Sequence, residues 1–141
     1  MAASTFDIEI ATPERLLYKE TAIRAQIPAK DGYIGVLPDH APLLSELGIG
    51  ALTYTTPGDH FFSLAINGGY LEIYDNVVRV LSDVAEKSQE IDVTQAEKDL
   101  KHAQDALINP ALGMDIAAAL IAARHAQARI DAARKAANNE E

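Results

Sequence analysis

The stretch GVLPDHAPLL, residues 35–44, holds two prolines, one histidine and a terminal pair of leucines. A loop that only reverses the chain needs a glycine or an asparagine and some polarity. This stretch is apolar, and it is stiff because Pro38 and Pro42 fix their own φ angles. We expect Leu43 and Leu44 to anchor it in a core, and we expect the stretch as a whole to contact a partner.

Composition is typical of a soluble folded protein. Of 141 residues, 48% are hydrophobic and 23% charged, a size that suits one core or a small core with an appendage. The net charge of -9 argues against nucleic acid or an anionic membrane surface as the main partner, because both need a basic footprint. Zero cysteines exclude disulfides and thiolate chemistry. The acidic N-terminal residues lack a long apolar run, so we expect neither signal peptide nor anchor, and a cytoplasmic protein.

Residues 1–88 carry the signals of β-strands. They contain seven of the eight glycines, five of the six prolines and every aromatic residue. Polar and apolar residues alternate in FDIEIAT (6–12), TAIRAQI (21–27) and NVVRVL (76–81), with turn residues between the runs. Strands at this spacing, with no helix pattern between them, predict an antiparallel β-sandwich or barrel.

Residues 89–141 are rich in alanine and carry a helical pattern. Apolar residues recur at intervals of three and four over 92–107 and again over 116–137, and Asn109, Pro110 and Gly113 interrupt them. Asp92 suits the N-cap of the first helix, and Gln95 suits the reciprocal capping position. The sequence therefore predicts an α+β protein in which an antiparallel two-helix hairpin follows the sandwich. Alanine buries little area, so we expect the hairpin to be held weakly.

The last helix is basic within an acidic chain. Residues 1–88 hold twelve acidic and six basic side chains, whereas 116–137 hold Asp131 against Arg124, Arg129, Arg134 and Lys135. Two interpretations stay open. The cations either form a solvated face near the helix C-terminus, where the macrodipole favours them, or they dock on an acidic partner.

Motifs for catalysis are absent from the sequence. It contains no GxxxxGK[ST], GxGxxG, HExxH or GxSxG pattern. Its four histidines lie in different predicted elements without the spacing of metal ligands: His40, His60, His102 and His125. We predict no catalytic residues and no metal site.

Three segments together carry a resemblance to a known family: DGYIGVLPDHAPLLSELGIG (31–50), INGGYLEIYDNVVRVLSDVAE (66–86) and the alanine-rich tail that begins EIDVTQAE (90–97). Over essentially its whole length the chain resembles the epsilon subunit of bacterial F-type ATP synthases, the counterpart of the mitochondrial delta subunit. The resemblance implies a flattened sandwich over 1–88 and a regulatory hairpin over 89–141. It also implies a non-catalytic rotor subunit that couples the c ring to gamma during ATP synthesis, with catalysis left to alpha and beta. Such a subunit is a peripheral component at the cytoplasmic face of the bacterial inner membrane.

The resemblance also assigns roles to particular residues. It implies that the segment around Tyr33 and His40 contacts the c ring, although a purely local hydrogen bond remains an alternative for His40. It implies that the hairpin can extend to reach alpha and beta. There it would restrain ATP hydrolysis through Arg124, Arg129 and Arg134, which are spaced by five residues.

Some members of this family bind ATP in the folded hairpin through the motif I/L-D-x-x-R-A. Here the motif runs from Ile91 and Asp92 to Gln95, which stands where the family has arginine. Of the other basic positions, only Arg129 keeps a permanent cation, since the rest match His102 and His125. Guanidinium groups are the usual ligands of a triphosphate, so we expect weak or no nucleotide binding and no cofactor.

One other function stays open. The chain would then be a small β-sandwich protein-interaction module whose helical tail pairs with a partner coiled coil.

Overall fold

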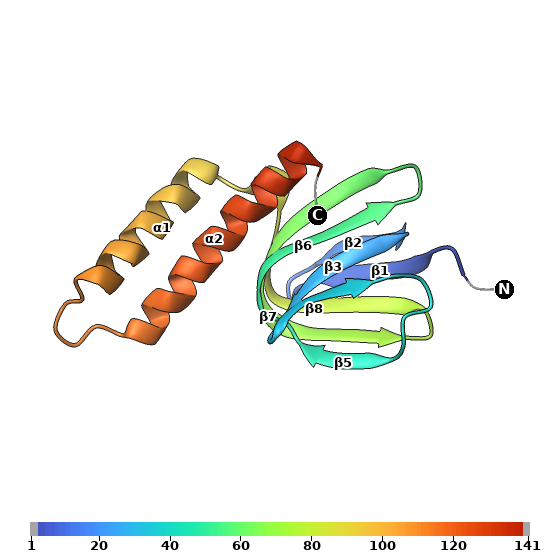
Figure 1. Cartoon of the computed structure of the whole chain (residues 1–141), viewed down its shortest axis with the longest axis horizontal. Coiled ribbons are helices and arrows are strands. Elements are labelled where there is room, and N and C mark those ends of the chain that lie inside the picture. Colours follow the sequence, from blue (N-terminus) through green and yellow to red (C-terminus); the bar gives the residue numbers. More distant parts are fainter. Residues whose placement is uncertain (1–2, 140–141) are drawn as a thin grey trace.

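The computed structural model describes residues 3–139, as a β-sandwich followed by two helices (Figure 1). The elements are β1 (Phe6–Ala11), β2 (Leu16–Ala22), β3 (Arg24–Ala29), β4 (Gly32–Val36), β5 (Leu43–Glu46), β6 (Ile49–Thr56), β7 (His60–Tyr74), β8 (Val77–Lys87), the 3-10 turn η1 (Ser88–Glu90), α1 (Val93–Ile108) and α2 (Ile116–Asn138). The predicted fold class is confirmed.

The long strand β7 joins the two layers of the sandwich. Its first half pairs with β6 and its second half with β5, and β8 follows it along most of its length. Gly68 and Gly69, at φ of 73° and 107°, lie where it passes from one layer to the other. A Cβ on Gly69 would collide with the carbonyl oxygen of Leu81, so the two backbones can approach here only because residue 69 is glycine.

Two details of the strands differ from the sequence prediction. The strand β1 pairs with β8 in parallel, with Ile8 opposite Val78, whereas every other strand pair within residues 3–139 is antiparallel. The run TAIRAQI is not one strand: β2 ends at Ala22 and β3 begins at Arg24. Between them the Ile23 amide donates to the Thr55 carbonyl oxygen at 2.8 Å. The sequence marks this break, because Ala22 and Ile23 are consecutive apolar residues and the alternation changes phase there, from buried Ala22 to buried Ala25.

The core lies between the two layers. As predicted, Phe6, Ile8 and Ile10 share the buried face of β1. They meet the inward side chains of the other strands, among them Ile27, Leu52, Tyr54, Leu64, Ile66, Leu71, Ile73, Val78 and Val80.

The stretch 35–44 anchors by one leucine, and the prediction that both would be buried is wrong. Leu43 packs against the core, but Leu44 is 74% exposed. Both belong to β5, in which successive side chains point to opposite faces, so burial of the first directs the second to solvent.

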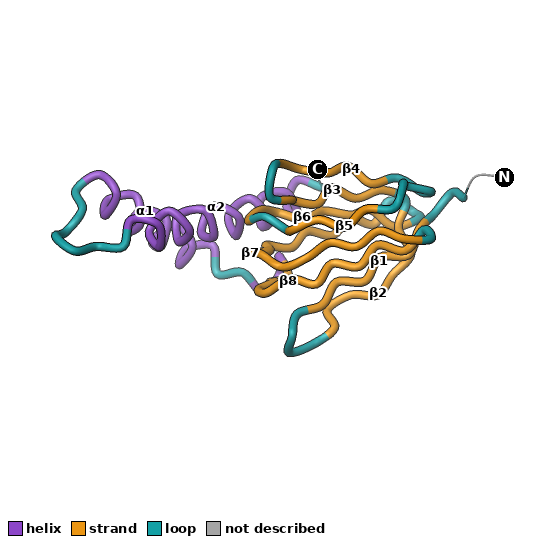
Figure 2. Tube along the Cα trace, turned by 90° about the horizontal axis from the view of Figure 1, so that it is seen from below, coloured by secondary structure: helices purple, strands orange, loops and turns teal. Residues whose placement is uncertain are grey.

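The helices form the predicted antiparallel hairpin. The helix α2 lies against the outer face of β6 and β7, and α1 packs on α2 farther from the sandwich (Figure 1). The loop between the helices lies at the end that projects away from the strands (Figure 2). Asp92 caps α1 as predicted by accepting from the Gln95 amide at 3.0 Å. The Gln95 side chain donates instead to Asp99 at 2.8 Å, so the reciprocal bond of a capping box is not formed.

Candidate functional site

The contact between hairpin and sandwich is small and built from alanines. Ala128 and Ala132 of α2 meet Ala51 of β6 and Ala65 of β7, with Ile49 and Ile91 packed at the side. Each alanine removes only one methyl group from water, on the order of 1 kcal/mol at about 25 cal/mol per Å². The contact between α2 and the sheet is therefore built from small residues.

Buried hydroxyl groups weaken the same contact. Thr53 and Ser63 are a cross-strand pair two residues beyond Ala51 and Ala65, so the pleat places them on the face that α2 covers. Their Oγ atoms are buried and find no hydrogen-bond partner within residues 3–139. Burying a hydroxyl without a hydrogen-bond partner destabilises the docked form by about 1 to 3 kcal/mol. When α2 leaves the sheet, water can bond to the hydroxyl and this penalty is removed. The contact is thus suited to reversible docking.

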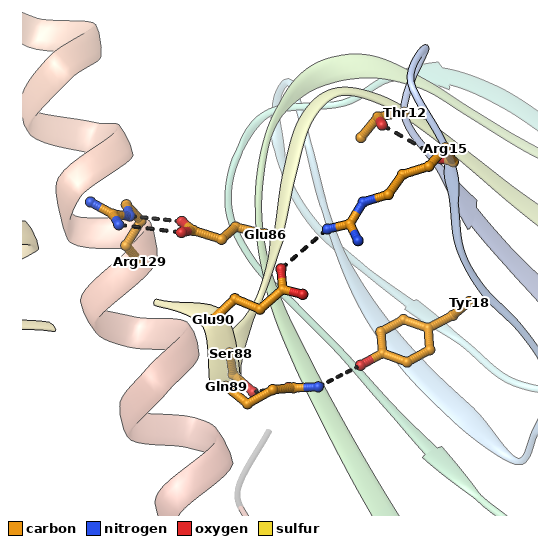
Figure 3. Close-up of polar contacts among 8 residues, drawn as sticks. All are labelled: Thr12, Arg15, Tyr18, Glu86, Ser88, Gln89, Glu90 and Arg129. Atoms are coloured by element: carbon orange, nitrogen blue, oxygen red, sulfur yellow. Dashed lines mark hydrogen bonds and ion pairs between the residues drawn. The ribbon is translucent and has the colours of Figure 1, made fainter. Parts of the chain in front are cut away.

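One ion pair opposes this weakness. Arg129 of α2 donates to both carboxylate oxygens of Glu86 on β8, from Nε to Oε1 at 2.8 Å and from Nη2 to Oε2 at 3.3 Å (Figure 3). Its Nη1 also lies 3.7 Å from Oδ2 of Asp99 on α1. The Arg129 side chain is only 15% exposed. A single guanidinium therefore links the sandwich, α2 and α1.

The turn η1 is fastened to the sandwich independently of the helices. Arg15 forms an ion pair with Glu90 at 3.2 Å, and Gln89 donates to the Tyr18 hydroxyl at 3.4 Å (Figure 3). The Lys87 ammonium lies 4.6 Å from the centroid of the Tyr18 ring. Gln89 and Glu90 are thus linked by their side chains to β2 and to the β1–β2 loop. For Ile91 and Asp92, which follow them, no such link is present within residues 3–139.

The residues of the ATP motif have structural roles here. Ile91 packs beside the alanine contact, while Asp92 and Gln95 serve the helix cap and Asp99. Arg129 pairs with Glu86, and it also lies 3.7 Å from Asp99, the carboxylate to which Gln95 donates. The polar groups of Asp92, Gln95 and Arg129 are thus engaged within the folded hairpin and with Glu86.

A groove of about 460 Å³ lies between the two helices. Asp99 and His102 of α1 face His125 of α2 across it, and alanines and Met114 line the rest. Burial, followed by the neighbouring Arg129, lowers the pKa of His125 below its ordinary value, and Glu86 and Asp99 oppose this only in part. Within residues 3–139, no group of side chains is suited to hold a metal ion.

The three arginines that were predicted to be regulatory have different surroundings. Arg129 is largely buried at the Glu86 pair, whereas Arg134 is exposed and lies 3.8 Å from Asp131 on its own helix. Arg124 is exposed and borders a cleft of about 570 Å³ between α2 and the β3–β4 turn. Only Arg124 and Arg134 are free to reach a partner while the hairpin is folded.

Tyr33 and His40 lie in separate places. Tyr33 lines the cleft beside Arg124, and its hydroxyl accepts from the Ala51 amide at 3.1 Å. His40 lies in the loop after β4, where its Nδ1 is 2.8 Å from the Ala41 carbonyl oxygen. The preceding Asp39 amide donates to Asn76 in the β7–β8 turn, so this loop borders that turn. The structure does not bring the two predicted ring contacts together.

An exposed apolar patch on the other layer was missed. Tyr70, Glu72 and Tyr74 are alternate residues of β7, so their side chains point to the same face. On that face Leu81 of β8 lies opposite Tyr70, and Leu44 of β5 lies opposite Glu72. The exposed apolar residues are therefore Leu44, Tyr70, Tyr74 and Leu81. These four apolar side chains, which we call the outer patch, are 54 to 74% exposed. Arg79 crosses the face with bonds of 3.1 Å to Glu9 and to Glu72. Alternation in GGYLEIYDN, with Leu71 and Ile73 facing the core, could have revealed it.

The sandwich, docked hairpin and exposed patch define an interaction protein, in which surfaces carry the function. Residues 5–88 match the family described as ATP synthase, Delta/Epsilon chain, beta-sandwich domain. The chain is 49% identical over 131 residues to the ATP synthase epsilon chain of Solibacter usitatus, covering 93% of this chain and 97% of that relative. It is 39% identical over 135 residues to the epsilon chain of Syntrophomonas wolfei, covering 96% and 98%.

Solved structures share the fold. A chain in the Euglena gracilis mitochondrial ATP synthase, OSCP/F1/c-ring, matches with a TM-score of 0.80 at 21% identity, covering 98% of this chain and 84% of that chain. A chain of the Tetrahymena thermophila central stalk/c-ring matches with a TM-score of 0.52 at 15% identity, covering 92% and 94%.

The chain belongs to the family of ATP synthase epsilon chains, which confirms the predicted family and its non-catalytic class. No helix within residues 3–139 is long and apolar enough to cross a membrane.

Proposed function

We propose that the chain works in the central stalk of a proton-translocating F-type ATP synthase, where its sandwich joins gamma and the c ring. The relatives named above are ATP synthase epsilon chains, and the matched structures come from assemblies whose names include F1, central stalk and c-ring. In this proposal it is a peripheral component at the cytoplasmic face of a bacterial inner membrane, and it meets the membrane only through the complex.

The outer patch is the observation that supports gamma binding. Large apolar side chains at 54 to 74% exposure on one sheet face commonly mark a protein interface. Here the Arg79–Glu72 ion pair lies between Tyr70 and Tyr74, so the surface combines apolar and charged groups. Tyrosines are enriched at such interfaces because they bury a large ring and keep a hydroxyl for a hydrogen bond. The patch also lies on the layer opposite the one that α2 covers, so gamma can bind whether or not the hairpin is docked.

For the c ring we propose two contact points, Tyr33 and His40. Both side chains are at least partly accessible, and Tyr33 is 54% exposed. Since they lie apart, each would meet a different loop of the ring.

For the hairpin we propose a regulatory role toward alpha and beta. The alanine contact and the unpaired hydroxyls of Thr53 and Ser63 favour release, and Arg129 and Glu86 hold the folded form. Once released, Arg124, Arg129 and Arg134 would be free to pair with acidic segments of the catalytic head and restrain hydrolysis.

Co-purification with gamma tests the proposal. The full chain and gamma, co-expressed, should elute together from a sizing column as a complex. Separate elution at micromolar concentrations would contradict it and favour the generic interaction module.

A further inference from the structure

His125 occupies a position in which only the neutral imidazole is well accommodated. It lies on α2 in the groove between the helices, half-buried. Its Nδ1 is shielded from solvent and has no hydrogen-bond partner among residues 3–139. A neutral imidazole carries a single N–H, which can lie on Nε2, whereas the protonated ring carries an N–H on both nitrogens, including the buried Nδ1. Protonation would therefore leave a buried donor unpaired.

The charged groups around His125 are already engaged. From α2 it faces Arg129, from β8 Glu86, and from α1 Asp99 and His102. Glu86 accepts two bonds from Arg129, and Asp99 accepts from Gln95 and lies near Arg129. A proton on His125 thus adds a second cation beside Arg129, where the nearby carboxylates are shared.

From this geometry we propose that His125 is a proton-operated release for the hairpin, such that protonation weakens the packing of α2 against α1 and against the sandwich. Only the functional consequence rests on the proposed regulatory role: acidification would favour the released hairpin, the form proposed to restrain hydrolysis. Docking itself is a property of the isolated chain.

The direction follows from proton linkage. The pKa of His125 is lowered in the docked hairpin by burial and then by Arg129. It returns toward its ordinary 6.5 when release separates α2 from α1 as well as from the sandwich, because the groove that buries the ring lies between the two helices. Above that pH the ring is neutral in both forms, so docking keeps its full strength. As the pH falls below it, the released form binds the proton first, and docking weakens until the lowered pKa is reached. One such proton changes the equilibrium by at most about tenfold per pH unit.

The test uses the full chain, which contains no native cysteine to interfere with labelling. Dyes are attached at Glu14→Cys in the β1–β2 loop and at Glu97→Cys on α1, both exposed positions. Energy transfer between them is measured by single-molecule fluorescence from pH 7.5 to 5.5. We expect the ratio of released to docked molecules to rise severalfold below pH 6.5, and up to about tenfold by pH 5.5.

Two variants assign the effect. His125→Gln removes the titrating group but keeps a polar side chain, and it should hold the ratio constant over this range. His102→Gln is the matched control, because His102 lines the same groove from α1 and is exposed. It should respond as the parent does. Far-ultraviolet circular dichroism at pH 7.5 confirms that both variants are folded.

Any of three results would overturn the proposal: a parent chain whose ratio does not change with pH, a His125→Gln chain that responds like the parent, or loss of the response in His102→Gln. None of these concerns gamma binding, so failure here is distinguishable from failure of the proposed stalk function.

Discussion

Arg129 and Glu86 form a two-bond ion pair, at 2.8 and 3.3 Å, that joins the hairpin to a sandwich it otherwise meets through alanines. Both side chains are largely buried, with 15% and 26% exposed. Since a buried charge-assisted pair is far more directional than alanine packing, this pair fixes where α2 lies on the sheet. The docking strength is thus concentrated in one residue pair.

Changing Arg129→Gln should weaken docking strongly. It removes two charge-assisted bonds and leaves Glu86 partly buried without its partner, a loss of about 1.5 to 3 kcal/mol or more. Hydrogen exchange of the α2 amides should accelerate on the order of tenfold to a hundredfold. Arg134→Gln is the matched control, because its 3.8 Å contact with Asp131 is exposed and should contribute little. Equal exchange in the two variants would contradict the importance given to Arg129.

A chain that ends at Ser88 should fold as the sandwich alone and still bind gamma. The core lies wholly between the strands, and the outer patch lies on the layer that α2 does not cover. We expect its circular dichroism to be that of a β-protein, with a cooperative thermal transition.

A second truncated chain, ending at Glu90, refines this prediction. It restores the Arg15–Glu90 pair and the Gln89–Tyr18 bond, so its melting temperature should be equal or slightly higher. If the chain ending at Ser88 proves unfolded, or folded but unable to bind gamma, the proposed division into 1–88 and 89–141 is wrong.

Titration of the full chain with ATP should give no saturable heat in the micromolar range. Gln95 and Asp92 are engaged in the cap and with Asp99, and Arg129 is held by Glu86, so no cluster of free guanidinium groups faces the groove. Gln95→Arg should strengthen whatever binding exists. A clear micromolar isotherm for the parent chain would refute this interpretation.

The sequence predicted the elements well because their patterns are local. The alternation of Phe6, Ile8 and Ile10 determines which face of β1 is buried. Asp92 caps α1 by accepting from the amide of Gln95, only three positions along the chain. The family resemblance rested on the same local segments. Each of these inferences needs only neighbouring residues.

What could not be predicted depends on contacts between distant residues. Arg129 and Glu86 are 43 positions apart, and their pairing requires knowing which helix docks and on which face. The parallel pairing of β1 with β8 and the exposure of Leu44 likewise depend on where the strands lie in the sandwich. For the same reason Tyr33 and His40, seven positions apart in the sequence, could be assigned to one surface although the structure separates them.

The regulatory proposal predicts different effects for the arginines in ATP hydrolysis by the reconstituted complex. Truncation near Ser88 should raise hydrolysis, and changing Arg124, Arg129 and Arg134 together to alanine should reproduce part of that rise. Arg129 also holds the hairpin on the sandwich, so its loss both removes a charge and favours release. A double variant that changes only the exposed Arg124 and Arg134 removes charge without breaking the Arg129–Glu86 pair, and so distinguishes the two effects. Equal rates in all preparations would leave the hairpin without a regulatory role.

The binding of gamma to variants of the outer patch tests the central claim most directly. Affinity is measured by surface-immobilised titration for the full chain, for Tyr70→Ser with Tyr74→Ser, and for Leu112→Ser. Leu112 is fully exposed in the loop between the helices, far from the patch in the fold, and serves as the control (Figure 1). Loss of two interfacial tyrosines should weaken binding at least tenfold, since each such residue commonly contributes about 1 to 2 kcal/mol to the binding free energy. Leu112→Ser should bind like the parent. Unchanged gamma affinity in the double tyrosine variant would contradict the account, because gamma would then bind elsewhere on the molecule.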